Sequence, residues 1–186
     1  VMQITLQPPA DLQADSVTLP DPAEAIVGRP ATFEWQVTNR GDNAASGQWT
    51  DALYLSADTA WDINDAEIGQ TAISATIDPD QGYTRSMTAT VPGVLPGLYH
   101  VVLRSDLYRQ IRETPENRTN NTTASVGQIL VDCPELLLGT TVTATGLRTG
   151  TMDYYKIPNV PANMDLLISL NTQRKDVYTQ LFASHN

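Results

Sequence analysis

The sequence of 186 residues is poor in cysteine, lysine and histidine, and these shortages exclude several classes of protein. Cys133 is the only cysteine, so the chain has neither a disulfide framework nor a cysteine-based zinc site. The 21 acidic residues outnumber the 11 basic ones, which gives a formal net charge of −10. Nucleic acids and anionic membrane surfaces are recognised by clustered Lys and Arg. We therefore expect neither as a partner.

Long apolar runs are also missing, since none approaches the ~18 residues that a membrane-spanning helix needs. No membrane insertion is expected. Val1–Ile4 already alternates like a strand and does not resemble a secretory leader, so we expect a fragment boundary at the first residue. No long segment carries the apolar stripe of an amphipathic helix.

The sequence contains instead many short segments in which apolar and polar residues alternate. In Ala31–Asn39 this alternation places Phe33, Trp35 and Val37 on one face of a strand. Further strands are predicted at Val1–Gln7, Asp11–Leu19, Gln48–Ser56, Thr71–Ile77, Tyr83–Val91, Tyr99–Arg104 and Thr122–Val131. The residues expected to share one core are Phe33, Trp35, Val37, Leu53, Leu55, Val101 and Leu103. The pattern predicts an all-β protein.

Aromatic residues add detail to this prediction. Pro96-Gly97 shortly before Tyr99 is typical of a tyrosine corner, in which the phenol bonds backbone at the end of a sandwich. Trp49 is expected in the core. Trp61, and one of Tyr154 and Tyr155, are expected to be exposed.

An acidic connection between Ala57 and Ala66 is the candidate metal site. The potential ligands are Asp58, Asp62, Asn64, Asp65 and Glu67, and Asp106 and Glu116 are candidates to join them from the opposite connection. Calcium prefers such carboxylate and amide oxygens, and crowded carboxylates repel one another without a counter-ion. The spacing is not that of an EF-hand. Calcium is therefore predicted, and the alternative is a solvated turn in which Asp58 and Asp62 bond local backbone amides.

Catalytic patterns are not found in the sequence. His100 is expected to point outward from mid-strand, and His185, the other histidine, lies next to the last residue. A Ser-His-Asp triad needs a histidine within reach of its serine. We predict that the chain is not an enzyme. In the long polar connection Asp106–Asn121, Asn120 and Asn121 are expected to bond backbone.

Several motifs together resemble the CARDB family, the cell-adhesion-related domain found in bacteria. They are Trp49-Thr50-Asp51, Tyr54-Leu55-Ser56-Ala57-Asp58, Trp61-Asp62, Asp65, Ile68-Gly69, Pro96-Gly97-x-Tyr99, Glu116-Asn117 and Asn120-Asn121-Thr122. The resemblance implies a seven-stranded antiparallel sandwich of the fibronectin-III or immunoglobulin type over residues 10–132. Residues 1–9 are then expected to be a terminal strand of a preceding module and a linker.

A second domain is predicted after Cys133-Pro134. Asp153–Ile157, Val160-Pro161-Ala162 and the alternating Leu166, Ile168 and Leu170 resemble the pre-peptidase C-terminal type of β-sandwich. Its expected strands are Leu136–Thr145, Met152–Ile157, Asp165–Leu170 and Val177–Ser184. Residues 136–186 provide too few strands for a whole sandwich, so an incomplete one is expected.

Together, the resemblances imply a non-catalytic module of a larger secreted or surface-exposed bacterial protein, serving adhesion or structural spacing. The alternative is an accessory module that binds substrate or carbohydrate beside a secreted hydrolase such as a protease. A calcium-stabilised spacer is the third interpretation. The expected partners are neighbouring domains of the polypeptide, a protein or glycan ligand, and strand edges of a second copy.

Overall fold

The computed structural model describes residues 7–143, 152–163 and 165–170. In this part of the chain the elements are strands and one short 3-10 helix, η1 (Asn117–Asn120). The strands are β1 (Leu12–Thr18), β2 (Glu24–Ile26), β3 (Pro30–Asn39), β4 (Ala45–Ser56), β5 (Ala66–Ile77), β6 (Gly82–Thr90), β7 (Gly97–Arg104), β8 (Thr122–Ala124) and β9 (Ile129–Asp132).

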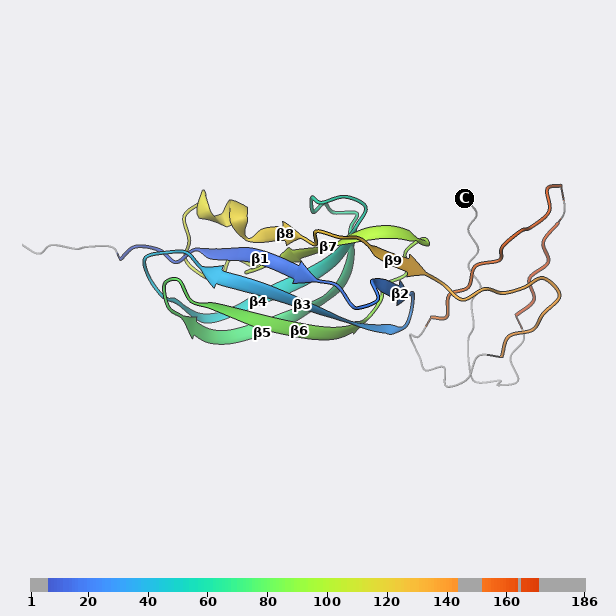
Figure 1. The fold of residues 1–186 in the computed structure, drawn as a ribbon, viewed down its shortest axis with the longest axis horizontal. Helices are drawn as coiled ribbons and strands as arrows, with labels where there is room; N and C mark the ends of the chain where they lie inside the picture. Colours follow the sequence, from blue (N-terminus) through green and yellow to red (C-terminus); the bar gives the residue numbers. More distant parts are fainter. Residues whose placement is uncertain (1–6, 144–151, 164, 171–186) are drawn as a thin grey trace, which may run out of the picture.

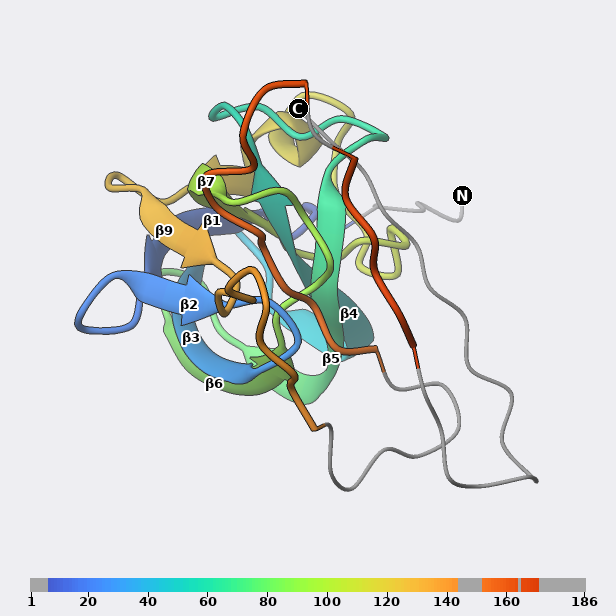
Figure 2. The same ribbon diagram turned by 90° about the vertical axis from the view of Figure 1, so that its right-hand side faces the viewer.

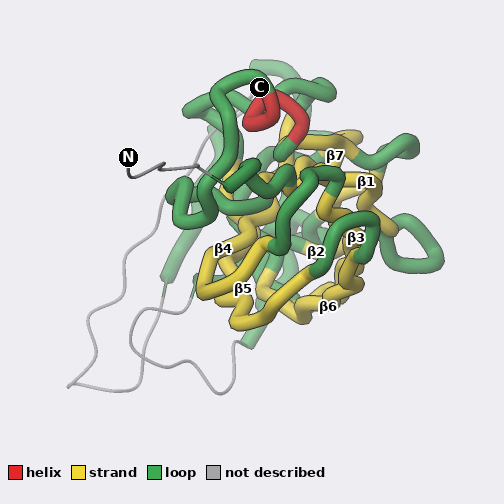
Figure 3. Tube along the Cα trace, turned by 90° about the vertical axis from the view of Figure 1, so that its left-hand side faces the viewer, coloured by secondary structure: helices red, strands yellow, loops and turns green. Residues whose placement is uncertain are grey.

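Two sheets pack face to face and make a β-sandwich, which Figure 1 shows from the side and Figure 3 from one end. One sheet has the order β1-β3-β6, and the other has the order β2-β9-β7-β4-β5 with β8 also paired to β7. The predicted all-β sandwich is confirmed. The predicted seven strands become nine, because β2 is an additional short strand and the predicted last strand is divided into β8 and β9. β2 also departs from the antiparallel pattern, since it pairs with β9 in parallel.

The core lies between the sheets and contains every residue that the alternation placed there. Phe33, Trp35 and Val37 are each 1% exposed, and Trp49 is equally buried. Leu53, Leu55, Val101 and Leu103 are also buried. Because side chains alternate between the faces of a strand, one residue of slip would have exposed the whole set.

The predicted last strand, Thr122–Val131, is broken in two. β8 pairs with Val102–Arg104, whereas β9 pairs with Gly97–Tyr99. At the break the Ser125 hydroxyl accepts the amide of Val101 at 3.0 Å and donates to the carbonyl of Gly127 at 2.7 Å. The Ser125 amide still donates to the Val101 carbonyl at 2.8 Å, so the side chain replaces only the return bond of the ladder. Strand propensity does not reveal this substitution.

The tyrosine corner is confirmed, but the expected display of Trp61 is wrong. The Tyr99 hydroxyl donates to the carbonyl of Leu95 at 2.8 Å. The guanidinium carbon of Arg104 lies 3.7 Å from the centre of the Trp61 ring, and the Tyr54 ring lies at its edge, 5.9 Å between centroids. Trp61 is half-buried because the cation and the aromatic edge cover it.

Residues beyond β9 continue past the end of the sandwich next to β2 and β9 (Figure 1). Of the strands predicted at Leu136–Thr145, Met152–Ile157 and Asp165–Leu170, the described parts form only a parallel bridge between Glu135 and Lys156. An apolar alternation yields a strand only where a partner supplies its hydrogen bonds. The predicted strand Val177–Ser184 and most of Val1–Gln7 lie outside the described residues.

Candidate functional site

The most concentrated polar chemistry in the described residues is a buried network centred on Asp51. Asp51 lies on the inner face of β4, in phase with Trp49 and Leu53, and it is 1% exposed. One carboxylate oxygen accepts the Trp35 indole N–H at 2.9 Å and the Tyr83 hydroxyl at 2.7 Å. The other accepts the Ser105 hydroxyl at 3.0 Å and the Asp106 amide at 3.2 Å.

These four donors connect both sheets through one carboxylate. Trp35 and Tyr83 belong to β3 and β6 in one sheet, and Asp51 belongs to β4 in the other. Burial raises the pKa of Asp51 and the hydrogen bonds counteract this rise. The Tyr83 hydroxyl also accepts the Trp49 indole N–H at 3.0 Å. The pKa of Tyr83 is raised mainly by burial and secondly by the negative charge of Asp51. The arrangement fastens the two sheets together.

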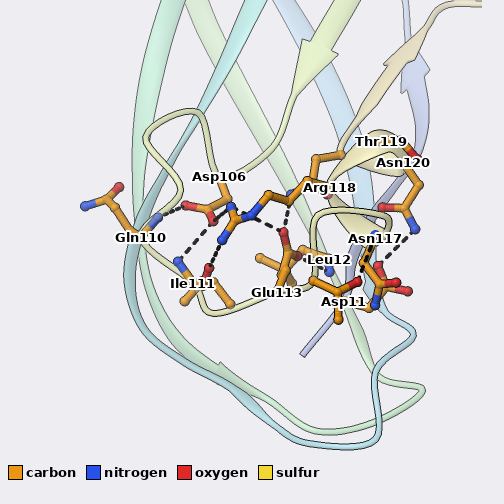
Figure 4. Close-up of polar contacts among 12 residues, drawn as sticks. Asp11, Leu12, Asp106, Gln110, Ile111, Glu113, Asn117, Arg118, Thr119 and Asn120 are labelled. Atoms are coloured by element: carbon orange, nitrogen blue, oxygen red, sulfur yellow. Dashed lines mark hydrogen bonds and ion pairs between the residues drawn. The ribbon is translucent and has the colours of Figure 1, made fainter. Parts of the chain in front are cut away.

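A second group of charged residues follows β7 and is drawn in Figure 4. Asp106 accepts the backbone amides of Gln110 and Ile111 at 2.6 Å and 3.0 Å, so its carboxylate closes the loop on itself. Nη1 of Arg118 lies 3.9 Å from a carboxylate oxygen of Asp106 and 3.9 Å from one of Glu113. Arg118 is thus the cation shared by two buried carboxylates.

Glu113 joins this connection to the first strand. Oε1 accepts the Leu12 amide at 2.6 Å and Oε2 accepts the Asn121 side-chain amide at 2.9 Å. Burial is the largest cause that raises the pKa of both Glu113 and Asp106. Oδ1 of Asn121 and Nη1 of Arg118 are buried without a hydrogen-bond partner among the described residues. The connection therefore holds β1 against η1 and the end of β7.

The acidic connection between β4 and β5 is built differently from the predicted calcium site. Asp58 accepts the Ala60 amide at 2.7 Å, Asp62 accepts the Asn64 amide at 2.6 Å, and Asp65 accepts the Asp62 amide at 2.8 Å. Glu67 lies on β5 and accepts from the Gln70 side chain at 3.1 Å. Within residues 7–143, 152–163 and 165–170, no three His, Cys, Asp or Glu side chains are grouped to hold a metal. The contacts of Asp58 and Asp62 are those of Asx-turns, and calcium binding stays a prediction of the sequence.

Two expectations for the β7–β8 connection are corrected. Asp106 bonds its own loop and Asp51 through its amide, so its side chain does not join the acidic connection. Asn120 and Asn121 donate to the carboxylates of Asp11 and Glu113 and not to backbone. Local patterns suggest backbone partners for Asn, but Asp11 reaches Asn120 from a distant part of the chain and Glu113 reaches Asn121 from within the same connection.

Histidine takes no part in these networks within the described residues. Nδ1 of His100 lies 2.9 Å from the carbonyl oxygen of Ser125, where it bridges β7 to the residue after β8. His185 lies outside the described residues. Alternation could have placed Asp51 in the core, because it is in phase with Trp49 and Leu53. The partners of Asp51, and the contact of Glu113 with Leu12, depend on contacts between distant segments.

The comparison with protein families decides the affiliation. The CARDB family model matches residues 9–125. The chain belongs to the CARDB family. The match ends before β9, so this last strand of the sandwich lies outside it. CARDB is a family of non-catalytic β-sandwich modules, and both carboxylate networks lie inside the matched range.

Solved structures with some similarity to this CARDB chain come from several organisms. The CARDB domain of the PF1109 protein from Pyrococcus furiosus, solved in complex with di-metal ions, is 19% identical, covers 70% of this chain and 95% of its own, and has a TM-score of 0.46. A β-glucosidase from Listeria innocua is 16% identical and has a TM-score of 0.37. The match covers 67% of this chain and 16% of the β-glucosidase. The sporulation control protein Spo0M from Bacillus subtilis is 15% identical and has a TM-score of 0.40. The match covers 66% of this chain and 49% of Spo0M. A search of curated proteins finds no match.

The described residues contain no helix that is long and apolar enough to cross a membrane.

Proposed function

We propose that this CARDB domain is a non-catalytic spacer in an extracellular bacterial protein, and that it separates neighbouring domains of the same polypeptide for adhesion. The main support is the position of the two ends of the sandwich. The chain enters before β1 at one end of the long axis and leaves after β9 at the other (Figure 1). A module of this shape extends a polypeptide in one direction.

The polar networks support the same function. The Asp51 carboxylate fastens the two sheets, and Glu113 holds the first strand at the end where the chain enters. The Asp51 carboxylate accepts four hydrogen bonds, and a buried polar network of this kind favours a single rigid arrangement. A spacer needs such rigidity, whereas a catalytic function needs reactive groups that a substrate can reach.

The alternative of an accessory carbohydrate-binding module beside a secreted hydrolase has less support. Sugars stack on displayed aromatic rings, but Trp61 is covered by Arg104. Tyr108 is 59% exposed and Tyr155 is 38% exposed, and they lie on different segments. The resemblance of residues 136–186 to a pre-peptidase C-terminal domain belongs to this proposal, since it suggests one neighbour of the sandwich.

Replacement of the sandwich in the full-length protein tests the spacer function. Residues 10–132 are deleted in one variant and exchanged for an unrelated β-sandwich of similar end-to-end length in another. Adhesion of cells that display the protein is then measured. We expect the deletion to weaken adhesion and the exchange to restore it. If the exchanged protein adheres as poorly as the deletion, the sandwich itself binds a ligand and the spacer function is wrong.

Calorimetric titration of the chelator-treated protein tests the predicted calcium site separately. Asp62 and Asp65 each use one carboxylate oxygen to accept a backbone amide, and the proposed calcium ligand is the other oxygen. A heat of binding that disappears in an Asp62→Ala, Asp65→Ala variant would support the site. Titration of the unaltered protein to millimolar calcium without heat would refute it.

A further inference from the structure

The end of the sandwich where β9 finishes carries a segment from further along the chain. This segment, Met152–Ile157, is called the clasp segment here. It returns to the sandwich after β9 has ended, and its backbone meets the residues that follow β9. The Leu136 amide donates to the Lys156 carbonyl at 2.8 Å, and the Lys156 amide donates to the Pro134 carbonyl at 2.9 Å. Figure 2 looks onto this end of the molecule.

A socket for the Tyr154 ring is formed by two glycines from different connections. Gly28 follows β2 and Gly93 lies between β6 and β7. A Cβ atom at Gly93 would lie 2.6 Å from Cε1 and 2.7 Å from Cζ of Tyr154, which is too close for two carbon atoms. A Cβ atom at Gly28 would lie 3.3 Å from Cδ2 of the same ring. The half-buried ring also packs against the hydrophobic core.

Charge complementarity adds a third contact to the backbone bridge and the socket. Nζ of Lys156 lies 2.7 Å from Asp132 and 3.7 Å from Glu135. Asp132 is the last residue of β9, so this ion pair joins the sandwich directly to the clasp segment. Lys156 is one of only two lysines in the sequence. The neighbouring Tyr155 is more exposed than Tyr154.

From these contacts we propose that the end of the sandwich is a docking site for an extended Tyr-x-Lys strand, occupied by Tyr154–Lys156 of the same chain. The two glycines select the aromatic ring, Asp132 and Glu135 select the cation, and the backbone of Pro134–Leu136 pairs with the strand. Docking fixes where the polypeptide leaves the sandwich. The proposal stands whether or not the sandwich is a spacer, because it concerns contacts within this chain.

Amide hydrogen exchange of the full 186-residue chain tests the docking. Leu136 and Lys156 are the reporters, because their amides donate the two hydrogen bonds of the bridge. We expect Tyr154→Ala to abolish the protection of both amides. Gly93→Ala should have the same effect without altering Tyr154, because its new methyl group occupies the place of the ring. Tyr155→Ala is the matched control and should leave both amides protected.

Two further measurements separate docking from general unfolding. Amides inside β3 and β4 must keep their protection in every variant, which shows that the sandwich is folded. The double variant with Gly93→Ala and Tyr154→Ala should lose no more protection than Tyr154→Ala alone, because both changes remove one contact. Unchanged protection of Leu136 and Lys156 in Tyr154→Ala, or an equal loss in Tyr155→Ala, would overturn the proposal.

Discussion

At the scale of single residues, Asp51 decides how the core of this protein is built. A carboxylate inside a sandwich is costly unless it is hydrogen-bonded. Here the donors come from Trp35, Tyr83, Ser105 and the backbone of Asp106. The acid therefore acts as a fixed acceptor that orients one indole, one phenol and one hydroxyl, and it specifies how the sheets face each other.

Removal of this acceptor should destabilise the protein strongly. We expect Asp51→Ala to lower the free energy of unfolding by roughly 2–4 kcal/mol, because a buried donor left without an acceptor costs about 1–3 kcal/mol. Urea denaturation followed by tryptophan fluorescence measures the change. The control is Asp42→Ala, which removes an exposed carboxylate between β3 and β4. Equal stability of the two variants would show that the Asp51 hydrogen bonds contribute nothing net.

Trp35 gives a second test at this scale. Its indole N–H bonds Asp51 and its ring is 1% exposed in the core. Trp35→Ala should cost about 3–5 kcal/mol, the range measured for deletion of large buried aromatic side chains. Trp35→Phe keeps most of the apolar volume but removes the N–H, so its smaller loss isolates the hydrogen bond. A loss in Trp35→Phe as large as that in Trp35→Ala would contradict this partition.

At the scale of elements, the strand β1 depends on a side chain from a distant connection. Glu113 accepts the amide of Leu12, the first residue of β1, and it is drawn at the centre of Figure 4. On its other side Arg118 supplies positive charge, and η1 lies against β1. An edge strand at the entry of the sandwich is thus held by more than its ladder to β3.

Loss of this acceptor should loosen β1 selectively. We expect Glu113→Ala to speed amide exchange at Leu12 while amides in β4 and β7 keep their protection. Glu113→Gln should behave nearly like the unaltered protein. Its Oε1 can still accept the Leu12 amide. Once the Asn121 side-chain amide turns over, Oδ1 of Asn121 can accept from the new amide group in place of the bond that Nδ2 donates to Glu113. Uniform loss of protection across all strands would instead show that Glu113 supports the whole fold.

The elements also show how far sequence reasoning reaches. Alternation placed Phe33, Trp35 and Val37 in the core, because a strand that buries one face carries an apolar residue at every second position. It missed β2, whose three residues pair with β9 rather than with a neighbour in sequence. It also missed Tyr154, since the glycines that receive its ring lie far away in the chain. The two-residue period of apolar side chains predicts which face of a strand is buried, but it does not predict which segment of the chain covers that face.

The residues of the candidate polar sites also divide into those that the sequence pattern identifies and those that only the fold reveals. The acidic residues after β4 were visible as a group, and their role as turn-forming acceptors was one of the two interpretations open from sequence. Asp51 was detectable by its phase, and Glu113 was not, because it stands in a connection without periodicity. Residues that act through distant partners need the fold before their function can be recognised.

At the scale of the whole molecule, buried carboxylates couple stability to pH. Burial raises the pKa values of Asp51 and Asp106 above 3.8 and that of Glu113 above 4.5. Between the ordinary and the raised values, the folded protein binds protons that the unfolded chain has already released. The free energy of unfolding therefore falls as pH rises through this range, and it increases when the pH is lowered.

We accordingly expect a higher free energy of unfolding at pH 5 than at pH 7, measured by urea denaturation at a series of pH values. The net charge of −10 favours the same trend, because acid relieves repulsion among surface carboxylates. Measurements at about 0.5 M salt screen that repulsion and leave the buried groups as the cause. Asp51→Asn removes one buried titrating group and should flatten the curve, whereas Asp42→Asn removes only an exposed charge. If both variants keep the slope of the unaltered protein in high salt, protonation of Asp51 does not couple stability to pH.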